Sequence, residues 1–147
     1  MRNNKLAGFT LIEIMIVIAI VIALVTIAVP GFLRSRVTAL EASAVANCRA
    51  IDNGCQLYHI NNDIFPANLT DLSGPASYPP YIDSVLASGR KNSYEYIYTL
   101  VDPDHFTLNA NPTTTGLLKG RYFYTDESGI IRFKVDSEAG PDDEIFK

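Results

Sequence analysis

A long apolar segment near the N-terminus places the tightest limit on what this chain can fold into. Residues 14–25 read IMIVIAIVIALV, and no charged side chain occurs from Ile14 through Leu33. An α-helix crosses the hydrocarbon core of a bilayer with about 20 such residues. We therefore expect one membrane-spanning helix over residues 9–33.

Two kinds of membrane-directed segment fit an apolar run at this place, a cleaved secretory signal and a retained anchor. A signal peptide has an apolar core of roughly 7–15 residues and then a small-x-small cleavage site. Here the run is longer and ends in Pro30-Gly31-Phe32, followed by Arg34 and Arg36. These features favour a retained helix. Arg2 and Lys5 on the short leader predict a cytoplasmic N-terminus, with the rest of the chain on the opposite side of the membrane.

Composition narrows the function classes further. The 147 residues include 12 basic and 16 acidic side chains, and an acidic body argues against nucleic acid as the main partner. Two cysteines are too few for a disulfide framework. The sequence has no nucleophile motif, glycine-rich phosphate loop or HExxH motif, and we interpret His105 beside Asp104 as surface. We expect no enzyme and no cofactor.

Glu13 lies inside the apolar helix, where an unpaired carboxylate costs at least a few kcal/mol. One interpretation is that it lies near the interface, protonated or hydrated. Another is a cationic partner, which the helix itself lacks because no Lys or Arg occurs between Lys5 and Arg34. Cleavage after Gly8 would create a partner, the free α-amine of Phe9. A charge pair completed only between chains would favour assembly and fix the stagger of neighbours.

The junction itself resembles a known signal. The residues Lys5-Leu-Ala-Gly8 followed by Phe9-Thr-Leu-Ile-Glu13 are similar to the cleavage and methylation signal of type IV prepilins and type II secretion pseudopilins. The resemblance implies that a prepilin peptidase cuts between Gly8 and Phe9 and then N-methylates Phe9. It implies that Glu13 is the intersubunit partner of that amine. It also implies a homopolymeric filament, an assembly ATPase and a membrane platform protein as partners.

The helix is expected to continue past the membrane as an amphipathic segment over residues 34–61. One face, at steps of three and four, carries the apolar or small residues Val37, Leu40, Ala44, Cys48, Ile51, Cys55 and Tyr58. The other side carries mostly Arg36, Glu41, Asn47, Arg49, Asp52 and Gln56. The cysteines are seven residues apart, about 10 Å along a helix. A disulfide needs about 7 Å or less, so we expect two unpaired packing residues.

Pro30 and Gly31 are expected to kink this helix, because proline removes a backbone hydrogen bond and clashes with the preceding turn. Pro30, in AVPGF, also matches the proline that the resembled family carries toward the end of its membrane stretch. Local melting at this point is a further interpretation, and the sequence leaves it open.

The C-terminal half predicts a small antiparallel sheet. After an irregular connection with short helical turns at 71–72 and 82–87, strands are expected at 94–101, 105–110, 121–125 and 130–135. Asp102-Pro103-Asp104 and the DESG segment at 126–129 predict two hairpins. About four strands packed on one long helix define an α+β fold, and the resemblance implies that it is a type IV pilin-like fold.

The acidic tail raises one metal hypothesis. Oxygen-rich turns can bind Ca²⁺, and major pseudopilins use calcium in their C-terminal region. Asp136, Asp142 and Asp143 are the candidates for a Ca²⁺ site here, although their spacing matches no calcium loop and a solvated acidic terminus is the favoured interpretation.

The sequence therefore predicts a cleaved leader at 1–8, an assembly and transmembrane helix at 9–33, and a globular domain at 34–147. The predicted function is that of a structural subunit of a type IV pilus. The chain would be a single-pass inner-membrane protein with a periplasmic domain before assembly, and would lie in a surface pilus afterwards. A major pseudopilin in a periplasmic pseudopilus is the first alternative, and a minor subunit is another. A membrane-anchored periplasmic binding or sensory protein is the alternative from another class.

Overall fold

The computed structural model describes residues 8–74, 79–114, 116 and 119–147. Most of the predicted leader, with Arg2 and Lys5, lies outside these residues. The chain divides into two compact units, residues 1–35 and 36–147. The helix α1, Leu11–Asn62, contributes its first part to one unit and its second part to the other. Its ends agree within two residues with the helix expected over 9–61.

In the first unit, α1 passes through Pro30 and Gly31 without a break. Proline lacks the N–H that would bond the carbonyl of Thr26, four residues earlier. Hydroxyl groups on either side bond to the backbone of the preceding turn. The Thr26 hydroxyl donates to the carbonyl of Ile22 at 2.8 Å, and the Ser35 hydroxyl donates to that of Gly31 at 3.1 Å. The kink at Pro30 stays a prediction.

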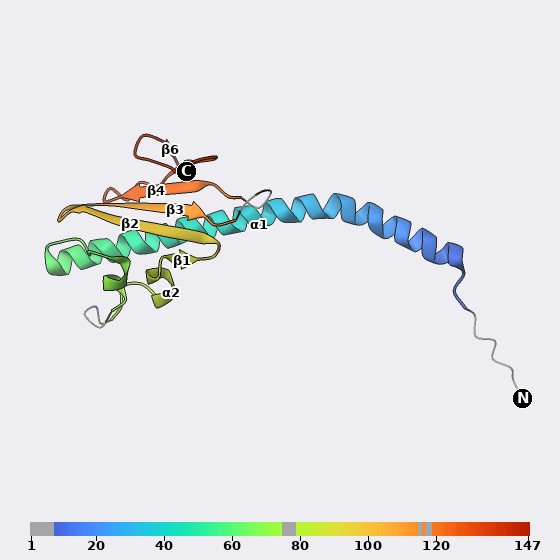
Figure 1. Ribbon diagram of the computed structural model, residues 1–147, viewed down its shortest axis with the longest axis horizontal. Helices are drawn as coiled ribbons and strands as arrows, with labels where there is room; N and C mark the ends of the chain where they lie inside the picture. The colour runs from blue at the N-terminus through green and yellow to red at the C-terminus, as the bar shows by residue number, and fades with distance from the viewer. Residues whose placement is uncertain (1–7, 75–78, 115, 117–118) are drawn as a thin grey trace, which may run out of the picture. The chain divides into compact units, whose positions relative to one another are not determined.

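The second unit holds a six-stranded antiparallel meander whose strands follow in chain order. It lies along the part of α1 that belongs to this unit (Figure 1). The strands are β1 Arg90–Lys91, β2 Tyr94–Asp102, β3 His105–Pro112, β4 Tyr122–Asp126, β5 Arg132–Lys134 and β6 Glu144–Ile145. Both predicted hairpins are present, β2–β3 and β4–β5.

The structure has six strands where about four were expected. The two additional strands, β1 and β6, have two residues each. Strands of this length show no alternation of apolar and polar residues, so periodicity cannot detect them. They flank the sheet, β1 pairing with β2 and β6 with β5. The fold class itself, a long helix on an antiparallel sheet, is confirmed.

The core of the second unit lies between α1 and one face of the sheet. From the helix, Ala44, Cys48, Ile51 and Cys55 are 0% exposed, which confirms the predicted apolar face. From the sheet, the alternate residues Phe106, Leu108 and Ala110 of β3 and Phe123 of β4 face this core, each 0% exposed. Burial and a nearby Asp52 carboxylate raise the pKa of both cysteine thiols to about 12, so the unpaired thiols stay protonated at neutral pH.

Two residues expected on the polar side of the helix are buried instead, and that part of the expectation was wrong. Glu41 and Asn47 are each 8% exposed. Asn47 donates a hydrogen bond to the Tyr96 hydroxyl at 2.9 Å, and Glu41 accepts two bonds from Arg121. Both partners lie on the sheet side, far along the chain. Burial of a polar group is tolerated where such partners exist.

The connection between α1 and the sheet contains two short helices, the 3₁₀ helix η1 (Leu69–Leu72) and α2 (Ser84–Ala87). They overlap the turns expected at 71–72 and 82–87. The Asp83 carboxylate caps α2 by accepting from the backbone N–H of Leu86 at 2.9 Å. Tyr81 packs edge-on against Tyr58, so this connection contacts α1.

Candidate assembly site

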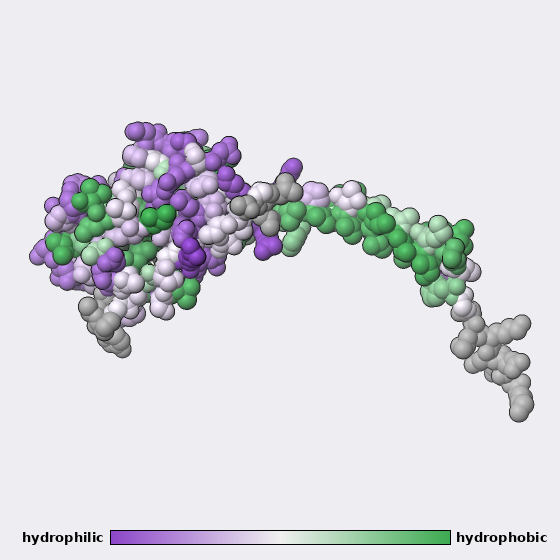
Figure 2. Space-filling model, viewed as in Figure 1, coloured by the Kyte–Doolittle hydropathy of each residue, from purple (hydrophilic) through white to green (hydrophobic). Residues whose placement is uncertain are grey.

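The first unit exposes an apolar surface that water does not solvate well. Phe9, Leu11 and Ile27 are 78%, 80% and 79% exposed, and the intervening large apolar side chains are exposed as well. Figure 2 shows this stretch as an almost unbroken apolar surface. By length and composition, α1 is able to cross a membrane. A patch of this size needs a covering partner, either lipid or other protein.

Glu13 lies in the first turn of this helix and closes a capping box with Thr10. Its Oε2 accepts hydrogen bonds from the Thr10 backbone N–H and from the Thr10 hydroxyl, each at 3.3 Å. In return the Thr10 Oγ1 accepts from the Glu13 backbone N–H at 3.3 Å. This reciprocal pattern satisfies two backbone donors of the helix start. Sequence reasoning overlooked it, although T-x-x-E before an apolar run is its signature.

The capping geometry fixes where the charge lies. A carboxylate in the first turn is favoured by the positive end of the helix dipole. Both bonds to the carboxylate end on Oε2, and a carboxylate has about four acceptor positions, so Glu13 keeps capacity to accept bonds from an amine. Phe9, which the predicted cleavage would make the first residue, directly precedes Thr10. Gly8 and Phe9 both lie outside the helix and are exposed.

The second part of α1 also presents an exposed face of unusual composition. This face lies opposite the buried one and carries Ala39, Ala42, Ala46, Arg49, Ala50, Asn53, Leu57 and Ile60. Arg49 is its one charged side chain, while Leu57 and Ile60 are 49% and 73% exposed. Solvent-facing helix surfaces are normally polar. Sequence reasoning placed six polar residues on this side and missed the alanines that dominate it.

A cluster of charged residues surrounds the β2–β3 turn. The Nδ1 of His105 lies 2.8 Å from Asp102, and its Nε2 lies 3.9 Å from the Glu127 carboxylate on the β4–β5 turn. Asp104, which the sequence placed beside His105, instead contacts the Nε2 of His59 at 3.4 Å. The hydrogen bond and charge of Asp102 raise the pKa of His105, helped by Glu127 and Asp104. The Asp104 backbone and then His105 lower the pKa of Asp102.

These shifts predict a pH-dependent stability of the second unit. Protonated His105 favours the folded state below its ordinary pKa of 6.5, and this contribution is lost as pH rises through the higher folded value. The contribution of Asp102 is present above 3.8 and is lost as pH falls through its lowered pKa. We expect the melting temperature of the full chain in detergent to fall slightly between pH 6 and 8.5. His105→Gln and Asp102→Asn should each flatten this slope, and an unchanged slope in both would contradict the assignment.

One of the three residues considered for Ca²⁺, Asp143, makes contacts within its own turn and with β5. Asp143 Oδ2 accepts the backbone N–H of Gly140 at 2.8 Å, and its other oxygen lies 3.3 Å from the Lys134 ammonium. Within residues 8–74, 79–114, 116 and 119–147, no group of three or more His, Cys, Asp or Glu side chains is placed to hold a metal ion. The carboxylate of Asp143 thus has a structural role in this turn.

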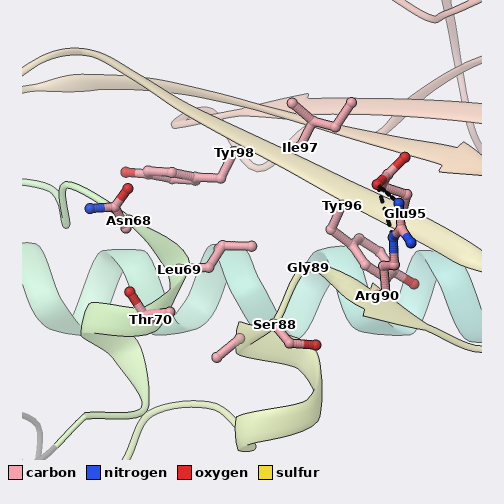
Figure 3. Close-up of a pocket in the computed structure, with 11 residues that line it drawn as sticks. Asn68, Leu69, Thr70, Ser88, Gly89, Arg90, Glu95, Tyr96, Ile97 and Tyr98 are labelled. Atoms are coloured by element: carbon pink, nitrogen blue, oxygen red, sulfur yellow. Dashed lines mark hydrogen bonds and ion pairs between the residues drawn. The ribbon is translucent and has the colours of Figure 1, made fainter.

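An open pocket of about 390 Å³ lies beside β2, between that strand, η1 and the segment that follows α2 (Figure 3). Its two charged side chains neutralise each other, because Arg90 donates to Glu95 at 2.6 and 3.0 Å. The Tyr98 hydroxyl donates to the carbonyl of Pro66 at 2.7 Å. The walls therefore present mainly neutral groups whose hydrogen bonds serve the fold.

A membrane-length apolar helix, a charged residue capping its first turn and a small α+β domain on its second part define a class: membrane-anchored subunits with a pilin-like fold. Comparison with known proteins agrees. The prokaryotic N-terminal methylation motif matches residues 3–29. The type II secretion system core protein G of Aeromonas hydrophila is 28% identical over 99% of this chain and 94% of that protein.

Two further relatives extend the comparison. The type IV wide pilus major component PilA4 of Thermus thermophilus is 34% identical over 64% of this chain and 72% of that protein. The competence protein ComGC of Halalkalibacterium halodurans is 33% identical over 45% of this chain and 65% of that protein. No solved structure matches significantly. The chain belongs to the family of type IV pilins and type II secretion pseudopilins.

Proposed function

We propose that this chain is a structural subunit that polymerises into a type IV pilus by packing its N-terminal helices together. The main supporting observation is the exposed apolar surface of the first unit, which begins at Phe9 and contains Glu13 in the first turn of α1, close to the predicted cleavage point. In the membrane, lipid covers this surface. In a filament, other copies of the same helix replace the lipid, so one surface serves both states.

The site residues of this proposal are those predicted from the sequence. A prepilin peptidase removes residues 1–8 by cutting between Gly8 and Phe9, and methylates the new amine. That amine then pairs with Glu13 of a neighbouring copy. An assembly ATPase and a platform protein act on the anchored subunit, whose domain, predicted to begin at residue 34, lies in the periplasm. Ca²⁺ at Asp136, Asp142 and Asp143 remains a lesser proposal, tested by metal titration of the full chain.

A major pseudopilin of a type II secretion system is the second candidate. It is favoured by the similarity to a core protein G over 99% of this chain. In both candidates the subunit polymerises through its N-terminal helix, and they differ in where the filament ends. Labelling the domain and imaging intact cells separates them, because a pilus exposes the label outside the cell and a pseudopilus keeps it in the periplasm. A membrane-anchored sensory protein would form no filament of either kind.

The exposed alanine face of α1 gives a direct test of polymerisation. Ala50→Glu places a charge in this face at a position with no lysine or arginine three or four residues away, and we expect it to leave the domain folded because Ala50 is exposed in the single chain. If the face packs against other copies, an unpaired buried carboxylate should lower filament yield about tenfold or more. Ala67→Glu makes the same change at an exposed loop position and serves as the control. Equal filament yield from both variants would argue against packing through this face.

A further inference from the structure

A shallow groove of about 300 Å³ lies in the second unit between α1 and the C-terminal segment. Its floor is apolar, with Val45 from the helix and Phe146 from the residues after β6. Glu41 also lines it, together with three cationic side chains, Arg49, Arg121 and Lys147. They come from three segments that are distant in sequence, so the fold itself gathers them.

Only one of these three cations forms an ion pair with another described residue. Arg121 already has partners within the domain. Its Nη2 donates to Glu41 at 2.8 Å, and its guanidinium lies about 5 Å from the ring centres of Phe133 and Phe146. Arg49 and Lys147 have no ion pair within the part of the chain that the structure describes. Residues 36–147 contain nine basic and fifteen acidic side chains, so this groove is a cationic exception on an acidic domain.

The matching anionic surface lies on the face of the sheet that points away from α1. The segment 136–144 carries five carboxylates, and four of them, Asp136, Glu138, Asp142 and Glu144, are exposed. It is fixed there by Asn109, which donates to the carbonyl of Ala139 at 2.9 Å, and by Asn111, which donates to Glu138 at 3.2 Å. Because the alternate residues of β3 face the helix, these asparagines face away from it. One domain thus presents a basic groove and an acidic segment on different faces.

We propose that the groove lined by Arg49 and Lys147 binds the acidic segment 136–144 of a second copy of this chain. Two complementary surfaces on different faces of one molecule make a heterologous contact, which forms an open helical filament wherever the rotation between copies does not close into a ring. The inference rests on the proposed function, since Arg49 lies on the face of α1 that would pack in the filament. Arg49 is exposed in the single chain, but packing of this face would bury its guanidinium, which would then need a carboxylate that no described residue of its own chain supplies.

Charge reversal tests this contact in cells that assemble the full chain. Arg49→Glu should lower the yield of sheared filaments about tenfold, because it sets two like charges against each other. Asp142→Arg should lower it similarly, and the double variant should recover most of the yield. Arg90→Glu changes the net charge by the same amount at an exposed intramolecular pair and should assemble as the wild type does.

The possible outcomes separate this contact from polymerisation itself. Wild-type yield from Arg49→Glu, or a double variant no better than either single one, would overturn the contact while leaving the filament proposal intact. Loss of binding to vesicles of anionic phospholipid without loss of filaments would likewise overturn it, in favour of a lipid headgroup as the occupant. If the wild-type chain forms no filament, the proposed function fails and this contact falls with it. A variant that combines Arg49→Cys with Asp142→Cys should form disulfide-linked multimers of the subunit within filaments. A ladder of such multimers on a non-reducing gel would support the contact independently.

Discussion

Replacing Glu13 by alanine is expected to leave the chain inserted in the membrane and its domain folded, while filament yield falls at least about tenfold. The single chain holds Glu13 only through Thr10, at 3.3 Å. In the filament its carboxylate would lie in an apolar surrounding with the Phe9 amine of a neighbour. Removing one partner of such a buried pair costs about 3–5 kcal/mol, well above the 1.4 kcal/mol that a tenfold change requires. Membrane fractionation and quantification of sheared filaments measure the two effects separately.

The capping box requires a control, because Glu13→Ala removes both the charge and the cap. Glu13→Gln separates them: glutamine at this position still reaches back to the helix start, so the cap persists and only the charge is lost. Thr10→Ala removes the hydroxyl that caps the Glu13 backbone N–H and leaves the charge of Glu13 in place. The charge-pair mechanism predicts a large loss with Glu13→Gln and a small one with Thr10→Ala. The opposite order would mean that helix capping, and not pairing between chains, is what assembly needs.

Replacing Glu41 by alanine is expected to destabilise the second unit strongly. The carboxylate is 8% exposed and accepts the backbone N–H and the guanidinium of Arg121 at 2.9 and 2.8 Å. Without it, a backbone donor and a cation held against two phenylalanine rings lose their partner. Such a loss costs about 2 kcal/mol or more, which lowers the melting temperature of a domain of this size by roughly 8 °C or more. Near-ultraviolet circular dichroism of the tyrosines in the full chain follows the unfolding.

Glu95→Ala is the matched control for this destabilisation. Glu95 also pairs with an arginine, Arg90, at 2.6 Å, but both side chains are well exposed, at 40% and 73%. Exposed pairs contribute about 1 kcal/mol or less. The melting temperature should therefore change little. Equal shifts in the two variants would show that Glu41 is no more important to the fold than a surface charge.

Features determined by neighbouring residues were predictable from the sequence. The apolar run, the helix ends, both hairpins and the buried helix face at Ala44, Cys48, Ile51 and Cys55 depend on local patterns, and the structure confirms them. Thr10 with Glu13 is also local, and its capping signature was available but overlooked. The assignment of Gly8, Phe9 and Glu13 to processing and assembly stays a prediction, because it concerns events between chains.

Features determined by distant residues were not predictable. Glu41 was placed on the polar side of the helix because it is charged. Its partner, Arg121, lies 80 residues away and gives no local signal. A local period cannot show that a carboxylate will meet an arginine on the sheet side. The strands β1 and β6 exist because longer neighbours offer them an edge, and not because of their own two residues. The alanine-rich outer face of α1 was missed for a related reason, since alanine suits a buried and an exposed helix position equally.

Mass spectrometry of the chain in purified filaments tests the central claim most directly. The proposed assembly requires an apolar helix whose terminal amine is created by processing and meets a carboxylate on the next copy. It predicts a single mature N-terminus at Phe9 that carries one N-methyl group. Filaments whose subunits retain Met1, or begin at any other residue, would contradict it.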